Sequence, residues 1–508
     1  MNGFVPNSIP STSSLDNKDF FCQDLPTRFL PQIGKILVTG ASGYIGGRMI
    51  PELLARGYRV RVMVRRISPE YAELWPGVEA VVADALEIGG LRTALKDIDT
   101  AFYLIHSLRL GPKEFASTDL QAAKNFRQIS EEMQVRRIIY LGGLGDIRNV
   151  LSSHLRSRAE VAQELRKGKA PVTVLRAAVI VGSGSASYEI IQHLIKKLRI
   201  VLIPPWAENR CQPIAIRDVI KYLVGVLENI DTAGKSFDIG GSDILTYEMM
   251  LKILAGLLKK KVFFLHVPLS STRLYAYITS LITPVPNSIT ECLMESLTNE
   301  VICQDETINN FLHFKPLSYK EAVIRAMTRE EQDRVYTRWS DAYPPAHEVA
   351  LKLHELKEGP AYTASYSLIA SKSATSLFNS ICKIGGKEGW FHYSWLWRLR
   401  GTIDRILLGV GSARGRKSSG SLRINDVIDF WRVEDLQNNK KLLLRAEMKI
   451  PGRAWLEFNI TKARGKQKLN ITAYYDTRAL LGKIYWYLCL PFHHFIFGNL
   501  IKEIEKRS

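Results

Sequence analysis

The sequence predicts an α/β protein with a doubly wound parallel sheet, followed by a separate α+β domain. Between residues 35 and 176, short apolar segments rich in β-branched residues alternate with segments of helical periodicity, as in a parallel sheet covered by helices. Beyond residue 425, long strand-like segments follow one another and end in one long helix. With 508 residues the chain exceeds one ordinary domain. The strands predicted for the sheet are residues 35–39, 59–64, 78–84, 100–106, 137–141 and 172–176, and the helices between them include residues 91–96, 119–134 and 155–166.

A glycine-rich turn follows the first predicted strand. Three glycines are spaced Gly-x-x-Gly-x-x-Gly, and residues 45–56 then repeat apolar side chains at helical spacing up to Gly57. Strand, glycine turn and helix in this order indicate a Rossmann-type dinucleotide fingerprint, one residue longer than its usual form; the alternative is a purely structural turn. Glycines let a pyrophosphate approach the backbone, and the helix N-terminus attracts its charge. The residues expected at the dinucleotide are Gly40, Ser42, Gly43, Tyr44, Ile45 and Gly46.

The ends of the next strands supply further candidate cofactor residues. The second strand ends at Arg65 and Arg66. An acidic residue there would bind the ribose 2′-hydroxyl of NAD, whereas an arginine accommodates the 2′-phosphate of NADP. The two arginines therefore favour NADP; the alternative is that they are surface residues at a strand end. Carboxyl ends of parallel strands meet at one edge of a sheet, so we expect further cofactor contacts from Asp84, Ala85 and His106.

Several motifs spread along the first 300 residues occur together. They are Thr39-Gly40-Ala41-Ser42-Gly43-Tyr44-Ile45-Gly46, Asp84-Ala85, Leu175-Arg176 with Val181-Gly182, Ile216-Arg217-Asp218-Val219, and Phe237-Asp238-Ile239-Gly240-Gly241. With them, residues 33–300 resemble the atypical, NmrA-like short-chain dehydrogenase/reductases of the extended type. The resemblance implies an NAD(P)-binding Rossmann domain with a small substrate lobe over residues 241–330. The chain also resembles a bacterial subgroup in which this domain is fused to a C-terminal domain of unknown function.

The resemblance implies a catalytic Ser together with a Tyr and a Lys four residues apart, and the sequence departs from this set. None of the 20 tyrosines has a lysine four residues later, and Gly142 and Gly143 stand where the Ser would follow the fifth strand. His154 and Arg158 stand where the Tyr and Lys would lie and keep the spacing. Histidine transfers protons near neutral pH, and arginine can orient a phosphate or ribose. His154 and Arg158 are therefore our catalytic candidates; the alternative is that both are surface residues at the start of a helix.

Composition sets the outer boundaries of the domains. Residues 1–32 are polar, without the apolar segment of a signal peptide, and predict a flexible leader. We expect the dinucleotide-binding domain and its lobe over residues 33–326, a charged linker over residues 327–360 and a last domain over residues 361–508. Residues 262–286 are apolar but too often interrupted by proline to span a bilayer. They predict a buried helix pair, with a substrate lid or a membrane-facing surface as alternatives.

The last domain is strongly basic. It has 25 Lys and Arg residues against 11 Asp and Glu, an excess of 14 positive charges out of a net +19 for the chain. Its strands and its final helix, residues 480–507, are similar to the START or polyketide-cyclase helix-grip fold, and this resemblance implies an apolar cavity. Basic and aromatic side chains near the end favour peripheral contact with an anionic membrane surface; the alternative is an ordinary solvated face. No nucleic-acid recognition motif is present, so nucleic acid is not an expected partner.

Together these observations predict an NADP-binding, oxidoreductase-like protein that acts on or senses a hydrophobic small molecule of the lipid or quinone class. The six cysteines are scattered without metal-ligand spacing, so we expect no metal and a reducing, cytoplasmic location, peripheral at the inner face of the membrane where the last domain binds lipid. One alternative is a non-catalytic NADP-sensing regulator or assembly factor, like NmrA-like regulators or the NADPH-binding accessory subunit of respiratory complex I. Another is a lipid or quinone carrier.

Overall fold

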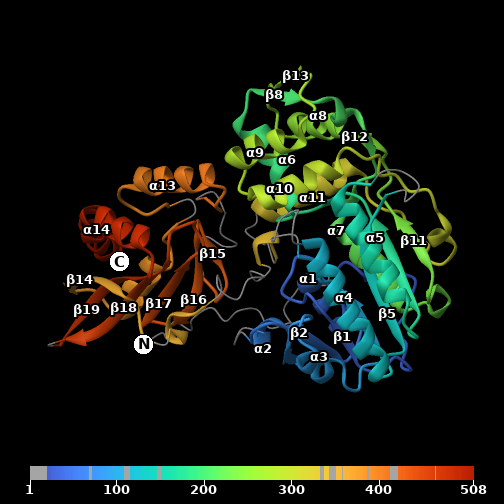
Figure 1. Cartoon of the computed structure of the whole chain (residues 1–508), viewed down its shortest axis with the longest axis horizontal. Coiled ribbons are helices and arrows are strands. Elements are labelled where there is room, and N and C mark those ends of the chain that lie inside the picture. Colours follow the sequence, from blue (N-terminus) through green and yellow to red (C-terminus); the bar gives the residue numbers. More distant parts are fainter. Residues whose placement is uncertain are drawn as a thin grey trace, which may run out of the picture.

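The structure is a computed structural model of the whole chain (Figure 1). It describes residues 20–67, 71–107, 115–145, 151–331, 337–341, 351–356, 358–385, 388–411, 422–463 and 465–508.

A seven-stranded parallel sheet forms the core of the first domain, which confirms the predicted fold class (Figure 1). Its strand order is β11-β6-β5-β4-β1-β2-β3, so the chain builds outward from β1 to β3 and then crosses to the other side of β1. The reversal between β1 and β4 is a topological switch point, where open α/β sheets bind ligands. The strands are β1 (Ile36–Val38), β2 (Val60–Val64), β3 (Glu79–Val82), β4 (Thr100–Tyr103), β5 (Arg137–Gly143), β6 (Val172–Ala177) and β11 (Ser236–Ile239).

Helices cover both faces of this sheet. Successive residues of a strand point to opposite faces. In β1, Ile36 and Val38 accordingly pack with α1 and α7, while Leu37 packs with α3, α4 and α5. Both faces are buried, which is why the strands read as continuous apolar segments. The helices are α1 (Gly46–Ala55), α2 (Tyr71–Leu74), α3 (Ile88–Leu95), α4 (Phe115–Glu132), α5 (Ser153–Arg166) and α7 (Ile216–Leu227).

A smaller lobe stands beyond the carboxyl ends of the central strands and has its own core (Figure 1). Residues 262–286 form the strand β13 and the single helix α9, so the predicted buried helix pair is wrong for this segment; the helix that packs against α9 is α10, which begins at Asn287. The lobe elements are β7 (Ile180–Val181), α6 (Ala186–Lys197), β8 (Ile200–Ile203), η4 (Pro205–Glu208), β9 (Arg210–Cys211), β10 (Ile214–Ala215), β12 (Leu245–Thr246), α8 (Tyr247–Leu257), β13 (Phe263–His266), α9 (Thr272–Ile282), α10 (Asn287–Ser296) and α11 (Tyr319–Glu331).

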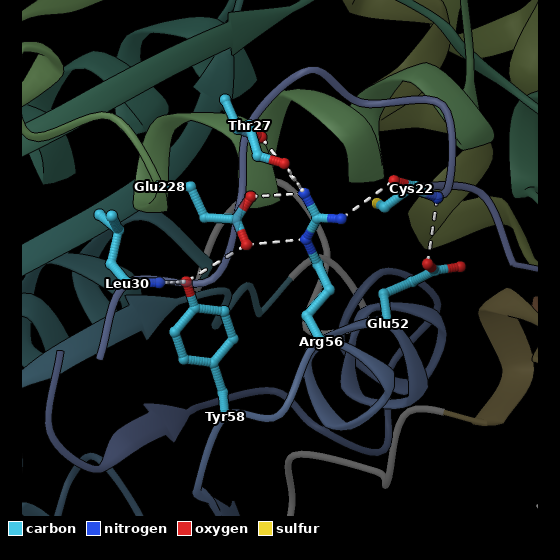
Figure 2. A network of polar contacts seen from close by, with 7 residues as sticks. All are labelled: Cys22, Thr27, Leu30, Glu52, Arg56, Tyr58 and Glu228. Atoms are coloured by element: carbon cyan, nitrogen blue, oxygen red, sulfur yellow. Dashed lines mark hydrogen bonds and ion pairs between the residues drawn. The ribbon is translucent and has the colours of Figure 1, made fainter. Parts of the chain in front are cut away.

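Residues 20–32 lie against the first domain, whereas we predicted a flexible leader through residue 32 (Figure 2). Arg56, just after α1, donates to the carbonyl oxygen of Cys22 at 3.1 Å and pairs with the buried carboxylate of Glu228 at 2.6 Å. Glu52 accepts a hydrogen bond from the N–H of Cys22. The polar composition concealed this docking, because the backbone of the segment makes most of these contacts. Residues 1–19 of the predicted leader lie outside the described residues.

Parts of the predicted linker, residues 327–360, are also packed on the first domain. Helix α11 continues into it, and Arg48 of α1 donates to the hydroxyl of Thr337 at 2.8 Å. Trp339 donates from Nε1 to Glu189 of α6 at 3.0 Å. The charged composition concealed these contacts, because buried arginines and carboxylates of the first domain are their partners. Residues 332–336, 342–350 and 357 of the linker lie outside the described residues.

The last domain has a six-stranded antiparallel sheet in the order β14-β19-β18-β17-β16-β15, and its described residues also form helices α12, α13 and α14 (Figure 1). The final helix and the later predicted strands are present, but the first long strand expected beyond residue 425 is divided into β15 and β16, which pair with each other as antiparallel strands. The likeness to START proteins stays a prediction. Helix α13 was not predicted: its N-cap residue Tyr393 has φ of 54° and makes no capping bond, and Gly401 lies inside it. No helix among the described residues is long and apolar enough to cross a membrane. The elements are β14 (Tyr362–Ala370), α12 (Ala374–Ile381), α13 (Ser394–Ile406), β15 (Val427–Ile428), β16 (Trp431–Gln437), β17 (Lys441–Ala446), β18 (Arg453–Ala463), β19 (Lys466–Asp476) and α14 (Leu480–Lys506).

Candidate active site

The glycine turn between β1 and α1 has the geometry that a dinucleotide phosphate requires. Gly40 has φ of +62°, and a Cβ there would lie 2.6 Å from the carbonyl oxygen of Leu104. A Cβ on Gly46 would lie 2.5 Å from the carbonyl oxygen of Gly40, so α1 can start this close to β1 only with glycine. The N–H groups of Ile45 and Gly46 donate no hydrogen bond to another described residue. They are available to an anion at the start of α1. The turn therefore fits a dinucleotide.

The carboxyl end of β2 is partly engaged by the linker. Arg66 forms a bidentate ion pair with Glu355, at 3.1 and 3.2 Å. At the end of β3, a carboxylate oxygen of Asp84 accepts the N–H of Leu86, which fixes the turn into α3. The next residue, Ala85, is buried and its carbonyl oxygen accepts from the side chain of Asn125. The predicted adenosine-side residues thus follow adjacent strands of the sheet, with an acidic residue of the linker on Arg66.

An apolar cavity of about 370 Å³ lies between the sheet edge and the lobe. One end is formed by Tyr44 and Ile45 of the glycine turn together with His106, Gly143 and His154. The other end is lined by side chains of the lobe, among them Ile190, Leu194, Trp206, Tyr247, Tyr275 and Leu293. The cavity therefore extends from the glycine turn and the two histidines into the lobe.

Four side chains form a hydrogen-bonded chain beside this cavity. Nδ1 of His106 lies 2.8 Å from a carboxylate oxygen of Asp119 on α4. Nε2 of His106 lies 3.1 Å from Nε2 of His154 at the start of α5. Nδ1 of His154 lies 3.0 Å from the hydroxyl of Ser296 at the end of α10. Arg158 does not line the main cavity but donates to the same oxygen of Asp119 at 3.2 Å. This row of hydrogen bonds thus connects the sheet edge to the lobe.

Burial and neighbouring charge decide which of these four hydrogen-bonded side chains carry a proton. Burial and the nearby charge of Arg158 lower the pKa of His106 to about 4, against the opposing effect of Asp119. Burial also lowers the pKa of His154 well below its ordinary value, with His106 and Arg158 adding to the effect. Burial alone would raise the pKa of Asp119, but its hydrogen bond with His106 and the nearby positive charge lower it. At neutral pH Asp119 is therefore ionised and both histidines are neutral.

One proton arrangement satisfies all of these bonds, and we assign it from the bonding pattern. His106 donates from Nδ1 to Asp119, His154 donates from Nε2 to His106, and Ser296 donates to Nδ1 of His154. The hydroxyl of Ser296 also lies 3.0 Å from the carbonyl oxygen of Cys292, so its proton has a second acceptor. When Ser296 turns to that carbonyl, Nδ1 of His154 is left as an acceptor at the cavity wall.

The structure brings the predicted residues together at one edge of the sheet. The sequence analysis missed Asp119, Ser296 and Trp206. Asp119 is a buried acid on an amphipathic helix, 13 residues after His106, and that buried position was the available signal. Ser296 and Trp206 belong to the lobe, and only the tertiary fold places them at the cavity. The indole N–H of Trp206 is buried and has no partner among the described residues.

The remaining motif residues stabilise the sheet and its junction with the lobe. Asp218 accepts the backbone N–H of Leu317 at 2.7 Å, and Arg176 of β6 pairs with Asp238 of the neighbouring strand β11 at 2.7 Å. A Cβ on Gly182 would lie 2.6 Å from the hydroxyl oxygen of Tyr44, so glycine allows the lobe to approach the dinucleotide turn. The residues at these motif positions therefore stabilise the structure around the site.

Comparison with known protein families agrees with this arrangement. Residues 32–341 match the model of the NmrA-like family. The chain belongs to the NmrA-like family. Residues 357–500 match a second family model, described as a protein of unknown function (DUF2867). The first domain is thus a Rossmann domain of the NAD(P)-binding, short-chain dehydrogenase/reductase-like type, followed by a domain with a family of its own.

Curated relatives match a shorter stretch of the chain. A 3-beta-hydroxysteroid dehydrogenase of Mycolicibacterium neoaurum is 31% identical over 117 residues, which are 21% of this chain and 31% of that protein. Sterol demethylase protein B of Methylococcus capsulatus is 29% identical over 114 residues, 22% of this chain and 35% of the relative. Cinnamoyl-CoA reductase 1 of Petunia hybrida is 28% identical over 119 residues, 22% of this chain and 36% of the relative. The chain spans about a third of the length of these relatives.

Solved structures align with the first domain at low identity. The Bordetella bronchiseptica enzyme WbmG in complex with NAD is 12% identical with a TM-score of 0.48, over 61% of this chain and 98% of that one. A nucleoside-diphosphate-sugar epimerase of Staphylococcus aureus is 14% identical with a TM-score of 0.47, over 57% of this chain and 99% of that one.

Proposed function

We propose that the protein is an NADP-dependent oxidoreductase for an apolar substrate that binds in the cavity between the sheet edge and the lobe. The observation that carries this proposal is the cavity itself. It begins at Tyr44 and Ile45 of the dinucleotide turn, passes the paired histidines and ends among apolar side chains of the lobe. A redox cofactor, a proton-transferring group and a substrate pocket thus have places next to one another.

The cofactor assignment rests on the turn and on the end of β2. Glycine is required at positions 40 and 46, and the N–H groups of Ile45 and Gly46 are available to a phosphate. Arg65 and Arg66 follow β2, where the 2′-phosphate of NADP is recognised in such folds. A bound NADP would supply or accept the hydride at the end of the cavity near His154.

The histidine pair supplies the proton transfer in this proposal. Neutral His154 can accept a proton at Nδ1 from a substrate hydroxyl that takes the place of Ser296. Asp119, through His106, keeps the rings oriented and stabilises the positive charge that forms, as the acid of a catalytic triad does. His154 returns the proton in the reverse direction. The pair therefore replaces the Tyr and Lys that the sequence lacks.

The lining of the cavity indicates the class of substrate. Its volume of about 370 Å³ lies within the usual range of ligand pockets, roughly 300–1,000 Å³. Its walls are mostly apolar, and Trp206 offers one N–H donor that lacks a partner among the described residues. An apolar alcohol or ketone with one additional oxygen fits this lining. The names of two relatives, a 3-beta-hydroxysteroid dehydrogenase and a sterol demethylase protein, refer to substrates of this kind.

One observation favours a second candidate, a non-catalytic NADP sensor. Arg66 pairs with Glu355, and Leu353 of the same segment donates its N–H to Glu434 of the last domain at 2.8 Å. A 2′-phosphate on Arg66 would compete with Glu355. Cofactor binding would then be communicated to the last domain without any turnover.

Turnover by the purified full chain distinguishes the two candidates. Apolar molecules that co-purify with the protein are identified by mass spectrometry, and steroid-sized alcohols and ketones are assayed with NADP and NADPH. We expect saturable turnover that His154→Gln lowers by roughly a hundredfold or more, the usual share of general acid–base catalysis. His193→Gln is the matched control, because within the described part of the chain His193 on α6 bonds the carbonyl oxygen of Glu189 alone and does not line the cavity. NADPH binding without turnover of any tested molecule would instead support the sensor.

A further inference from the structure

A second cavity, of about 280 Å³, lies inside the last domain and is lined by residues of its sheet and of helices α13 and α14. Its walls are largely aromatic, with Trp397 and Trp431 on one side and Trp486 and Phe497 of α14 on another. The ring centroids of Trp397 and Trp431 are 6.4 Å apart, and those of Trp397 and Phe497 are 6.3 Å apart. The cavity is therefore a compact aromatic chamber, separate from the site of the first domain.

Four polar groups of its lining are buried without a hydrogen-bond partner among the described residues. They are the indole N–H groups of Trp397 and Trp431, one guanidinium nitrogen of Arg400 and Nδ1 of His493. Buried donors without partners are rare because each costs about 1–3 kcal/mol. Several of them around one cavity indicate that a partner is supplied from outside the chain.

The neighbouring residue Trp455 shows that the domain can satisfy such groups when it uses them structurally. Trp455 also lines the cavity, yet its Nε1 donates to Glu434 at 3.0 Å. The unpartnered indoles and the guanidinium can only donate, so the missing partner must be an acceptor.

The charge of Arg400 is only weakly compensated. Its acidic neighbour Asp404 lies 3.9 Å away. Both oxygens of Asp404 already accept backbone N–H groups, from Lys449 at 2.6 Å and Gly411 at 2.8 Å. Arg400 itself donates to the carbonyl oxygen of Lys449 and to Tyr485, which leaves one nitrogen for an anion. A carboxylate from outside the chain would provide both an acceptor for the unpartnered donors and a negative charge for Arg400.

The cavity opens between α13 and α14. Leu399 and Ile403 of α13 and Phe492 of α14 line it, and all three are about half exposed to solvent. The exposed part of this entrance is thus apolar, while the unpartnered donors are buried.

We propose that this cavity binds an amphipathic carboxylate of the fatty-acid type, with its carboxylate on Arg400 and Trp431 and its apolar part among the aromatic walls. The full chain should bind dodecanoate saturably in isothermal titration calorimetry. Methyl dodecanoate, which lacks the charge, should bind more weakly. This site goes beyond the proposed oxidoreductase function and does not depend on it.

Two tryptophan substitutions form a matched pair for the test. Trp431→Phe removes an unpartnered N–H and should weaken dodecanoate binding by roughly tenfold, whereas Trp455→Phe changes the same wall but removes an N–H already bonded to Glu434, so it should weaken binding much less. In the absence of ligand we expect the opposite pattern for stability. Trp455→Phe should lower the Tm because it removes the hydrogen bond to Glu434, and Trp431→Phe should not lower the Tm because it removes no hydrogen bond. Trp206→Phe, in the first cavity, controls for binding there.

The outcomes separate cleanly. Arg400→Met should weaken dodecanoate binding by roughly ten- to a hundredfold. If this variant does not fold, the comparison of Trp431→Phe with Trp455→Phe tests the proposal. Absence of saturable binding by the unchanged protein, or equal loss in Trp431→Phe and Trp206→Phe, would overturn the proposal. Dodecanoate is offered both in buffer and in phosphatidylcholine vesicles. Faster loading from vesicles identifies a bilayer as the source, equal or faster loading from buffer identifies a free pool, and either supports the site.

Discussion

Asp119 does not line the cavity, yet it orients His106 directly and His154 through His106. Asp119→Asn removes the negative charge that stabilises a protonated histidine pair, so turnover should fall by roughly a hundredfold or more. The histidine pKa values should fall further, because Asp119 opposes their lowering in both cases. NMR titration of the histidine rings measures this shift apart from activity. An unchanged titration would show that Asp119 has only a structural role.

The pKa values of His106 and His154 make stability dependent on pH. Both are lowered by burial, so between pH 6.5 and about 4 the unfolded chain binds more protons than the folded one. Stability should therefore rise with pH through this window and be fully present above pH 6.5. For His106 the effect is on the order of 1–3 kcal/mol. Urea unfolding at several pH values should show a smaller pH dependence for His106→Gln than for the unchanged protein.

The preference for NADP over NAD should depend on Arg65, Arg66 and Glu355, whose carboxylate pairs with Arg66. Arg65→Ala with Arg66→Ala should reduce NADPH affinity by roughly ten- to a hundredfold and leave NADH affinity nearly unchanged, because only NADPH carries the 2′-phosphate. Glu355→Gln should strengthen NADPH binding by a few fold, since it removes the competing carboxylate. Titrations of both cofactors measure these effects. Equal affinities of the unchanged protein for NADH and NADPH would contradict the assignment.

The turn between β1 and α1 depends on a close approach of the helix to the strand. Gly46→Ala places a methyl group against the carbonyl oxygen of Gly40, so α1 must shift. NADPH binding should be lost and the Tm should fall. Gly89→Ala in α3 is the matched control, because a Cβ there meets nothing within 4 Å. This control should retain NADPH binding and gain up to about 1 kcal/mol of stability. NADPH binding by Gly46→Ala would exclude the turn as the phosphate site.

Helices and strands could be predicted from the sequence where their local pattern of apolar residues and glycines matches their place in the fold. The glycine turn and the strands of the parallel sheet follow from spacing and from apolar segments. Helix α13 was missed because Gly401, a residue typical of breaks between elements, lies inside it. The docking of residues 20–32 was missed because its partners, Glu52, Tyr58 and Lys221, are distant from it in sequence. Of the site, the sequence indicated His106 and His154, but their link to Asp119 and Ser296 depends on four elements meeting.

At the scale of the whole molecule, the two domains differ in charge and in their exposed apolar residues. The last domain has an excess of 14 positive charges, while the first 360 residues carry the remaining 5 of the net +19. The first half of α14 exposes one stripe of large apolar side chains while its opposite face lies on the cavity and core. The stripe consists of Leu480, Leu481, Ile484, Tyr487, Leu488, Phe492 and Phe495. An apolar stripe on a basic domain suits the interface of an anionic membrane.

We therefore expect the full chain to bind anionic vesicles peripherally, with α14 lying in the interface. It should float with phosphatidylserine-containing vesicles at low salt and be released as salt rises, because screening shortens the reach of the basic residues. Leu481→Glu with Leu488→Glu should abolish flotation, since neither residue lines the second cavity and both are largely exposed. Ile230→Glu is the matched control, because Ile230 is 67% exposed on the first domain, far from this stripe in sequence. Flotation that survives the α14 substitutions, or its absence at every salt concentration, would show that the stripe does not bind lipid.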